Sequence, residues 1–217
     1  MDDQLKDAIR TALRVNEIGR ASPYQLSFAG KGKSGASFGA SQGDLAAQPL
    51  ARDTLWKILA TNDVLRAKIA SILGQLSGPS YSNPLSTEDD RLVEQALASP
   101  QGRDLVDAMD KTIMDGVCQS VSECEDAAAA ANNSIDPIAK LFMALWINMT
   151  GPPTTLKEWV GGSEVWLDSH RNKIAPPSGQ VSSAMIINYL KSCDYFIANP
   201  GNFPHMQEAV AAGAAYL

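Results

Sequence analysis

Histidine and cysteine are scarce in this chain, and their scarcity limits the chemistry that it can perform. Among 217 residues there are 2 histidines, His170 and His205, and 3 cysteines. A serine or cysteine hydrolase needs a histidine to activate its nucleophile, and neither histidine lies in a nucleophile motif. No spacing of histidine, cysteine and acidic residues matches a tetrahedral metal site. The sequence therefore disfavours Ser/His and Cys/His catalysis, and it predicts neither a metal centre nor a cofactor.

Long apolar runs and an excess of positive charge are also missing. No apolar stretch approaches the roughly 20 residues of a membrane-spanning helix, so we expect no membrane insertion. The chain carries 18 Lys and Arg residues against 24 Asp and Glu residues, which gives a formal net charge of −6. Binding to nucleic acid requires clustered cations, so a nucleic-acid partner is disfavoured, whereas a neutral or cationic polymer suits the chain.

The first residues lack the features of a secretory signal peptide. Asp2 and Asp3 are acidic, and no apolar core follows them. We therefore expect a protein that is made in the cytoplasm without a signal peptide. Three interpretations stay open: the protein acts where it is made, it is exported by another route, or it is a module of a longer protein.

Helical periodicity dominates what is present. Apolar residues recur at helical spacing from Asp2 to a stop at Gly19, and Thr87 with Asp90 three residues later is typical of a capped helix start. The further predicted helices span 53–59, 63–76, 87–98, 102–117, 137–149, 181–198 and 204–215. The sequence predicts a mainly α (α+β) fold: one domain of residues 1–217, with a helix and a small β-hairpin in 1–50 and a helical body in 51–217.

Glu17 lies at the end of the first predicted helix. It follows Leu13 by four residues, and Leu13 follows Ile9 by four, so Glu17 continues the apolar stripe. A carboxyl group that keeps its proton near neutral pH needs partial burial or a negative neighbourhood, and a helix C-terminus beside a cleft offers both. This placement suits a general acid, and a solvated side chain at a frayed last turn is the alternative.

A glycine-rich polar segment follows Glu17. Residues 24–28 alternate between apolar and polar or small side chains, which indicates a strand, and a turn at 30–35 precedes a return strand at 37–39. The glycines of this segment permit close approach of a ligand. A phosphate-binding loop is the competing interpretation, but Lys-Ser or Lys-Thr does not follow the last glycine at the required spacing.

The three cysteines allow two interpretations. Cys118 and Cys124 enclose a polar stretch, whereas Cys193 lies in an amphipathic run and is predicted to belong to the core. A disulfide between Cys118 and Cys124 is feasible if the stretch is a loop, and it would imply an oxidising compartment. It is impossible in a continuous helix, because residues six apart point to different faces.

Two motifs resemble the lysozyme-like superfamily. In that superfamily a catalytic glutamate precedes a β-hairpin and a Gly-x-x-Gln element lines the sugar cleft, which is similar to Glu17 followed by Gly39-Ala40-Ser41-Gln42-Gly43-Asp44. The second motif, Trp146-Ile147-Asn148-Met149-Thr150-Gly151-Pro152 with Trp159 downstream, resembles the Tyr-Asn-Ala-Gly-Pro element and tryptophan of goose-type lysozymes and lytic transglycosylases. Here isoleucine replaces the tyrosine, and an additional residue precedes the glycine. The region 17–45 also resembles the active-site region of bacterial chitosanases.

This resemblance implies a lysozyme-like catalytic domain that cleaves β-1,4-linked amino-sugar polymers, usually peptidoglycan. Without a signal peptide, the implied protein is a phage endolysin or an antibacterial effector that acts in the periplasm or cell wall of a target bacterium. Its implied partners are peptidoglycan glycan strands, together with an immunity or delivery protein.

The resemblance also implies roles for individual residues. Glu17 would be the general acid that protonates the glycosidic oxygen. Asp44 would be the second catalytic carboxylate, although it precedes Leu45-Ala46-Ala47 and could instead cap the next helix. If Asp44 is only a cap, a neutral hairpin group would hold the attacking water, or the substrate's acetamido group would assist. The candidate substrate-binding residues are Tyr24, Ser34, Ser37, Gln42, Asn148 and Trp159.

The aromatic residues divide into stacking and core candidates. Tyr24, Trp159 and Trp166 are candidate surfaces for stacking against a sugar ring, whereas Trp56 and Trp146 lie in helical apolar patterns and are predicted to be core.

Two classes of function remain. The first is a lysozyme-type glycosidase, a muramidase in the leading interpretation, with a lytic transglycosylase or chitosanase as alternatives. The second is a non-enzymatic helical interaction domain of a secretion or phage apparatus, in which the hairpin is purely structural. Release of soluble muropeptides from purified sacculi separates the two.

Overall fold

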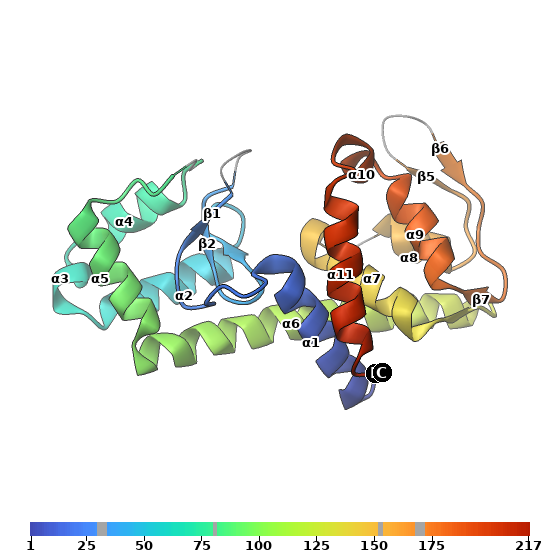
Figure 1. The fold of residues 1–217 in the computed structure, drawn as a ribbon, viewed down its shortest axis with the longest axis horizontal. Helices are drawn as coiled ribbons and strands as arrows, with labels where there is room; N and C mark the ends of the chain where they lie inside the picture. The colour runs from blue at the N-terminus through green and yellow to red at the C-terminus, as the bar shows by residue number, and fades with distance from the viewer. Residues whose placement is uncertain (30–33, 80–81, 152–153, 168–171) are drawn as a thin grey trace. The chain divides into compact units, whose positions relative to one another are not determined.

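The computed structural model describes residues 1–29, 34–79, 82–151, 154–167 and 172–217 (Figure 1). The structure is 64% helical with a few short strands, which confirms the predicted mainly α (α+β) class. Part of the predicted turn at 30–35 lies outside the described residues, as do His170 and Pro152. None of the described helices combines the length and the apolar character needed to cross a membrane.

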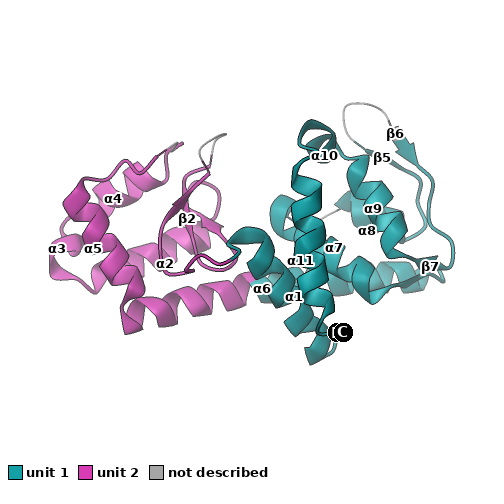
Figure 2. Cartoon of the chain, in the orientation of Figure 1, with its two compact units in different colours: residues 1–19, 114–217 teal, residues 20–113 magenta. Residues whose placement is uncertain are grey.

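The chain divides into two compact units, residues 1–19 with 114–217 and residues 20–113 (Figure 2). Their boundaries do not coincide with the division expected at residue 50, and the single domain stays a prediction. The long helix α6 (Pro100–Ala130) contributes residues to both units.

The first unit is built mainly from helices. Besides the second part of α6 it contains α1 (Asp3–Glu17), α7 (Pro137–Thr150), α8 (Thr154–Val160), α9 (Ser183–Lys191), α10 (Asp194–Ala198) and α11 (Asn202–Ala214). Its strands form two small ladders: β4 (Ser134–Ile135) pairs in parallel with β7 (Gln180–Val181), and β5 (Val165–Leu167) pairs antiparallel with β6 (Asn172–Ile174).

Helix α1 packs against α11 and α7 (Figure 1). Its N-terminus is capped by Asp2, whose carboxylate accepts a hydrogen bond from the backbone N–H of Leu5. The apolar stripe predicted from the sequence is buried as expected; its members are Leu5, Ala8, Ile9, Ala12 and Leu13. This stripe fixes the rotation of α1 about its own axis, and it therefore fixes the direction in which Glu17 points.

The second unit contains the small sheet and its supporting helices. The predicted hairpin is present as a three-stranded antiparallel sheet of β1 (Ser27–Phe28), β2 (Ala36–Phe38) and β3 (Gly43–Asp44). The helices that follow are α2 (Pro49–Ala60), α3 (Asp63–Arg66), α4 (Ile69–Leu76), α5 (Thr87–Ala98) and the first part of α6. Phe38 is fully buried beneath the sheet, together with Leu55 and Ile58 of α2.

The predicted helix boundaries were partly wrong. The helix predicted at 63–76 is interrupted between α3 and α4, and the one predicted at 181–198 is interrupted between α9 and α10. The segment 102–117 is only part of the longer α6. At α5 the capping residue is Ser86, one position before the predicted Thr87, and its hydroxyl accepts from the backbone N–H of Asp89.

The proposed disulfide between Cys118 and Cys124 is excluded. Both residues lie on the continuous helix α6, and Cys118, Cys124 and Cys193 are buried free thiols. Burial raises the pKa of the Cys118 thiol and raises that of Cys124 to about 12. The cysteines therefore give no indication of an oxidising compartment.

We expect alkylation of the unreduced, denatured protein to modify all 3 cysteines. In the native protein the same reagent should label Cys118 and Cys124 slowly, because both thiols are buried and remain protonated. Intact-mass spectrometry before and after reduction measures this. Two thiols that become reactive only after reduction would contradict the helical assignment.

The contact between α1 and α11 depends on a glycine. A Cβ atom at Gly213 would lie 2.5 Å from the backbone oxygen of Ala8 and 3.0 Å from Cβ of Ala12. We therefore expect Gly213→Ala to destabilise the protein by about 1–3 kcal/mol through overpacking.

Gly116 provides the matched control for this substitution. It lies inside α6, and a Cβ atom there would meet nothing within 4 Å. Gly116→Ala should therefore stabilise the protein by about 0.5–1 kcal/mol. Urea denaturation of the two variants measures both effects, and equal stabilities would contradict the close approach of α1 and α11.

Candidate functional site

The carboxyl group of Glu17 is the centre of a polar cluster in the first unit. Glu17 is the last residue of α1 and is partly buried. Its Oε1 atom accepts a hydrogen bond of 3.0 Å from Nδ2 of Asn148 on α7. The same oxygen accepts a second hydrogen bond of 3.0 Å from Nδ2 of Asn16. The carboxyl group is thus held by a neighbour in sequence and by a residue 131 positions away.

A histidine from a third helix completes the cluster. His205 on α11 places Nε2 at 2.9 Å from the backbone oxygen of Asn16, which lies at the C-terminal end of α1. The last carbonyl groups of a helix have no partner within the helix, so this contact satisfies one of them. Helices α1, α7 and α11 therefore each contribute a polar group around Glu17.

The electrostatic environment of Glu17 favours its protonated form. Burial raises the pKa of this carboxyl, and this effect outweighs the hydrogen bonds from Asn16 and Asn148 and the charge of His205, which lower it. The two amide donors favour the carboxylate once the proton has left. The group is therefore suited to hold a proton and also to release it.

The structure confirms that Glu17 is partly buried and brings it together with Asn148. Both residues were predicted as site residues from motifs in distant parts of the chain. Asn16 and His205 were missed as partners of the carboxyl group. Adjacency in sequence could have indicated Asn16, but nothing in the spacing of His205 indicates a contact with α1.

Asp44 has a structural task in the second unit. Its Oδ1 atom accepts hydrogen bonds from the backbone N–H of Ala46 at 2.7 Å and from that of Gly35 at 3.1 Å. It does not cap a helix, because α2 begins at Pro49 with Gln48 at the N-cap position. The predicted capping role is therefore wrong. The carboxylate instead ties strand β3 to the segment that precedes β2.

The predicted polar groups of the hairpin lie around the small sheet. The Gln42 backbone has a φ of 51°, its side chain accepts a hydrogen bond of 2.5 Å from Oγ of Ser27, and its amide donates to the oxygen of Gly39 at 3.2 Å. Ser37 on β2 pairs with Ser27 on one side and Asp44 on the other. Ser34 precedes β2 and is partly buried.

Asp110 on α6 anchors the turn before β3, and the sequence did not indicate this. Its two carboxylate oxygens accept the backbone N–H groups of Ala40 at 2.7 Å and Ser41 at 3.0 Å. Burial raises the pKa of Asp110, whereas these two hydrogen bonds lower it. Gly39 has a φ of 85°, and a Cβ atom there would lie 2.7 Å from Oδ1 of Asp110. The positive φ favours glycine at this position, and a Cβ atom there would displace the Asp110 carboxylate.

The aromatic predictions had mixed outcomes. Trp159 is only 2% exposed, its indole N–H donates to the backbone oxygen of Ala175 at 2.8 Å, and its ring packs against Tyr189 at 4.9 Å. Its predicted role in substrate binding is therefore corrected to a role in the core. Trp56, predicted to be core, is 51% exposed.

Tyr24 is fixed against α6 in the second unit. Its hydroxyl donates to Oδ1 of Asp107 at 2.9 Å, and the Arg103 guanidinium lies 5.0 Å from the ring centroid. Burial and the neighbouring Asp107 carboxylate raise the pKa of the Tyr24 hydroxyl. One face of the ring is thus occupied by Arg103.

The predicted site residues belong to both units. Glu17 and Asn148 lie in the first unit, whereas Tyr24, Ser34, Ser37, Gln42 and Asp44 lie in the second. Within the described ranges, no three His, Cys, Asp or Glu side chains gather in a way that could hold a metal ion.

No protein-family model matches the chain, and comparisons with curated proteins and solved structures give no significant match.

The raised pKa of Glu17 predicts a pH-dependent stability. The folded protein holds the Glu17 proton more tightly than the unfolded chain does. The free energy of unfolding therefore falls as the pH rises from the ordinary glutamate pKa through the raised pKa of the folded state. Glu17→Gln cannot ionise. We expect the free energy of unfolding of Glu17→Gln, relative to that of the wild type, to increase over this pH interval and then to stay constant.

Urea denaturation of both proteins at a series of pH values measures this difference. Glu208→Gln, on an exposed part of α11, controls for the substitution itself. A difference between Glu17→Gln and wild type that does not change with pH would contradict the burial of a titrating carboxyl.

Proposed function

We propose that the protein is a glycosidase that cleaves β-1,4 bonds of peptidoglycan, with Glu17 as its general acid. The observation that carries this proposal is the partly buried Glu17 carboxyl at the end of α1, whose pKa is raised by burial. A general acid must be protonated when the substrate binds, and burial keeps a carboxyl protonated to a higher pH than water does.

The partners of Glu17 support the same role after proton transfer. When the proton moves to the glycosidic oxygen, the carboxylate left behind accepts hydrogen bonds from Asn148 and Asn16. Hydrogen bonds to an ionised acceptor are stronger than those to a neutral one, so these contacts tighten as charge develops. The positive charge of a protonated His205 would add to this stabilisation.

Two mechanisms differ in the group that assists Glu17. In the first, Asp44 acts as a base or an electrostatic stabiliser, as in two-carboxylate glycosidases. In the second, the substrate's acetamido group assists and the products are anhydro sugars, as in a lytic transglycosylase. Asp44 already accepts hydrogen bonds from two backbone N–H groups. Because this gives the carboxylate a structural role, it favours the second mechanism.

Substitution of Glu17 tests the proposed general acid. We expect Glu17→Gln to fold, because a glutamine side-chain oxygen can still accept the hydrogen bond from Asn148. We expect it to lose hydrolysis of purified sacculi by several orders of magnitude, because no proton donor replaces the acid. Muropeptides released into solution are quantified by mass spectrometry, in which anhydro ends are lighter by one water. A folded Glu17→Gln protein that solubilises sacculi at the wild-type rate would refute the assignment.

Asp44→Asn distinguishes a catalytic role of Asp44 from a structural one. Asparagine can still accept the N–H groups of Ala46 and Gly35 through its side-chain oxygen but carries no charge. If Asp44 is a catalytic carboxylate, this variant should lose the reaction rate while its thermal stability holds. If Asp44 is structural, Asp44→Asn should stay active, and Asp44→Ala should lose roughly 1–3 kcal/mol of stability.

A further inference from the structure

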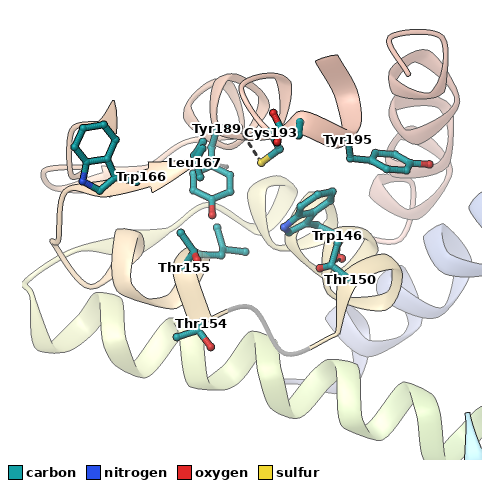
Figure 3. A pocket seen from close by; sticks show the side chains of 11 residues that line it. Trp146, Thr150, Thr154, Thr155, Trp166, Leu167, Tyr189, Cys193 and Tyr195 are labelled. Carbon is teal, nitrogen blue, oxygen red and sulfur yellow. Dashed lines mark hydrogen bonds between the residues drawn. The ribbon is translucent and has the colours of Figure 1, made fainter. Parts of the chain in front are cut away.

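A pocket of about 430 Å³ lies in the first unit, between α7, α8, β5, α9 and α10 (Figure 3). The lining residues combine aromatic rings, hydroxyl groups and one carboxyl group, and include Trp146, Thr150, Trp166, Tyr189 and Asp194. The volume falls in the usual range for small-ligand sites, roughly 300–1,000 Å³.

This pocket does not belong to the Glu17 cluster. Trp146 lines it, whereas Asn148, two residues further along α7, contacts Glu17. Two residues advance an α-helix by about 200°, so these side chains leave α7 in nearly opposite directions. Neither Glu17 nor His205 lines the pocket.

The charged groups among the described residues around the pocket disfavour ionic ligands. Asp194 is the one carboxyl group among the described lining residues, and none of them is a lysine or arginine, so this lining offers no cation to a phosphate or carboxylate. The ammonium group of Lys173 lies 4.5 Å from the ring centroid of Trp166 and pairs with Glu164 at 2.5 Å. Because Lys173 already occupies one face of this ring, a cationic ligand beside Trp166 would meet a like charge.

The remaining surface suits a neutral ligand with both C–H faces and hydroxyl groups. Trp166 is 55% exposed and stands at the edge of the pocket on β5, while Trp146 stands on the other side of Tyr189 (Figure 3). Thr154 and Thr155 make no side-chain hydrogen bond within the described part of the chain. The hydroxyl of Thr150 donates to the oxygen of Trp146 at 2.8 Å, which leaves its oxygen able to accept.

We propose that this pocket binds a neutral carbohydrate, with a sugar ring stacked on the face of the Trp166 indole that Lys173 does not cover and the threonine hydroxyls bonded to sugar hydroxyls. A pyranose has an apolar C–H face and a polar rim, and it carries no charge. These properties match the aromatic edge, the hydroxyl groups and the absence of cations in the described lining. The proposal concerns binding alone, so it does not depend on the proposed catalytic role of Glu17.

Fluorine NMR of the full chain labelled with 5-fluorotryptophan tests this pocket directly. The chain has 4 tryptophans, so their resonances can be assigned by single substitutions to phenylalanine. We expect the N-acetylglucosamine tetramer, or maltotetraose as a second neutral probe, to shift the Trp146 and Trp166 resonances saturably. Trp56 is 51% exposed in the second unit and serves as the internal control.

The energetic test compares two exposed tryptophans. By titration calorimetry, Trp166→Ala should raise the Kd for the better-binding sugar roughly tenfold through loss of the stacking surface, whereas Trp56→Ala should leave it unchanged. Both variants should fold, because both side chains are more than half exposed. The measurement is made in the Glu17→Gln background so that the probe is not consumed.

Other outcomes would overturn the proposal. If lysine amide or inorganic phosphate shifts Trp146 and Trp166 and the sugars do not, the pocket takes an ionic ligand. If sugars bind but move only Trp56, or if Trp166→Ala leaves the affinity intact, the sugar is bound elsewhere. A sugar that binds this pocket in a protein that fails to solubilise sacculi would support the pocket while refuting the proposed glycosidase.

Discussion

The close packing of α1 against α11 and α7 is the constraint on which the Glu17 site depends. Gly213 allows the backbone of α1 to approach α11, and the buried stripe of α1 fixes its rotation. Together they bring the end of α1 into hydrogen-bonding contact with Asn148 and His205. A carboxyl at a frayed helix end would be solvated. Here the neighbouring helices partly bury it, so its pKa rises.

The second unit uses carboxylates in a different way. Asp44 and Asp110 each accept hydrogen bonds from two backbone N–H groups, and these bonds hold the turns around the small sheet. Glu94 on α5 adds a further contact by accepting the backbone N–H of Leu26. With strands of only two or three residues, the sheet has few ladder hydrogen bonds of its own. Side-chain acceptors therefore stabilise a glycine-rich segment that has little regular structure.

Much of the helical framework and the position of Glu17 could be predicted from the sequence, because both follow from local apolar periodicity. The apolar stripe through Ile9 and Leu13 indicates which side of α1 is buried. The long-range contacts could not be predicted in this way. In the sequence, Asp110 resembles any other charged residue of a helix, although its carboxylate binds the turn before β3. Likewise, no residue near Trp159 in the sequence indicates that its indole N–H donates to the backbone oxygen of Ala175. The polar stretch between Cys118 and Cys124 resembled a loop, but in α6 its helical hydrogen bonds continue without interruption.

The proposed role of Glu17 requires that this carboxyl holds its proton to a higher pH than an ordinary glutamate does. Carbon NMR of side-chain carboxyl groups in the labelled protein tests it most directly, with the Glu17 resonance assigned from its loss in Glu17→Gln. We expect a Glu17 pKa above the ordinary value of about 4.3, and a further rise in Asn148→Ala, which removes a donor to the carboxylate. A Glu17 pKa at or below the ordinary value would show that burial does not govern this carboxyl and would refute its role as a general acid.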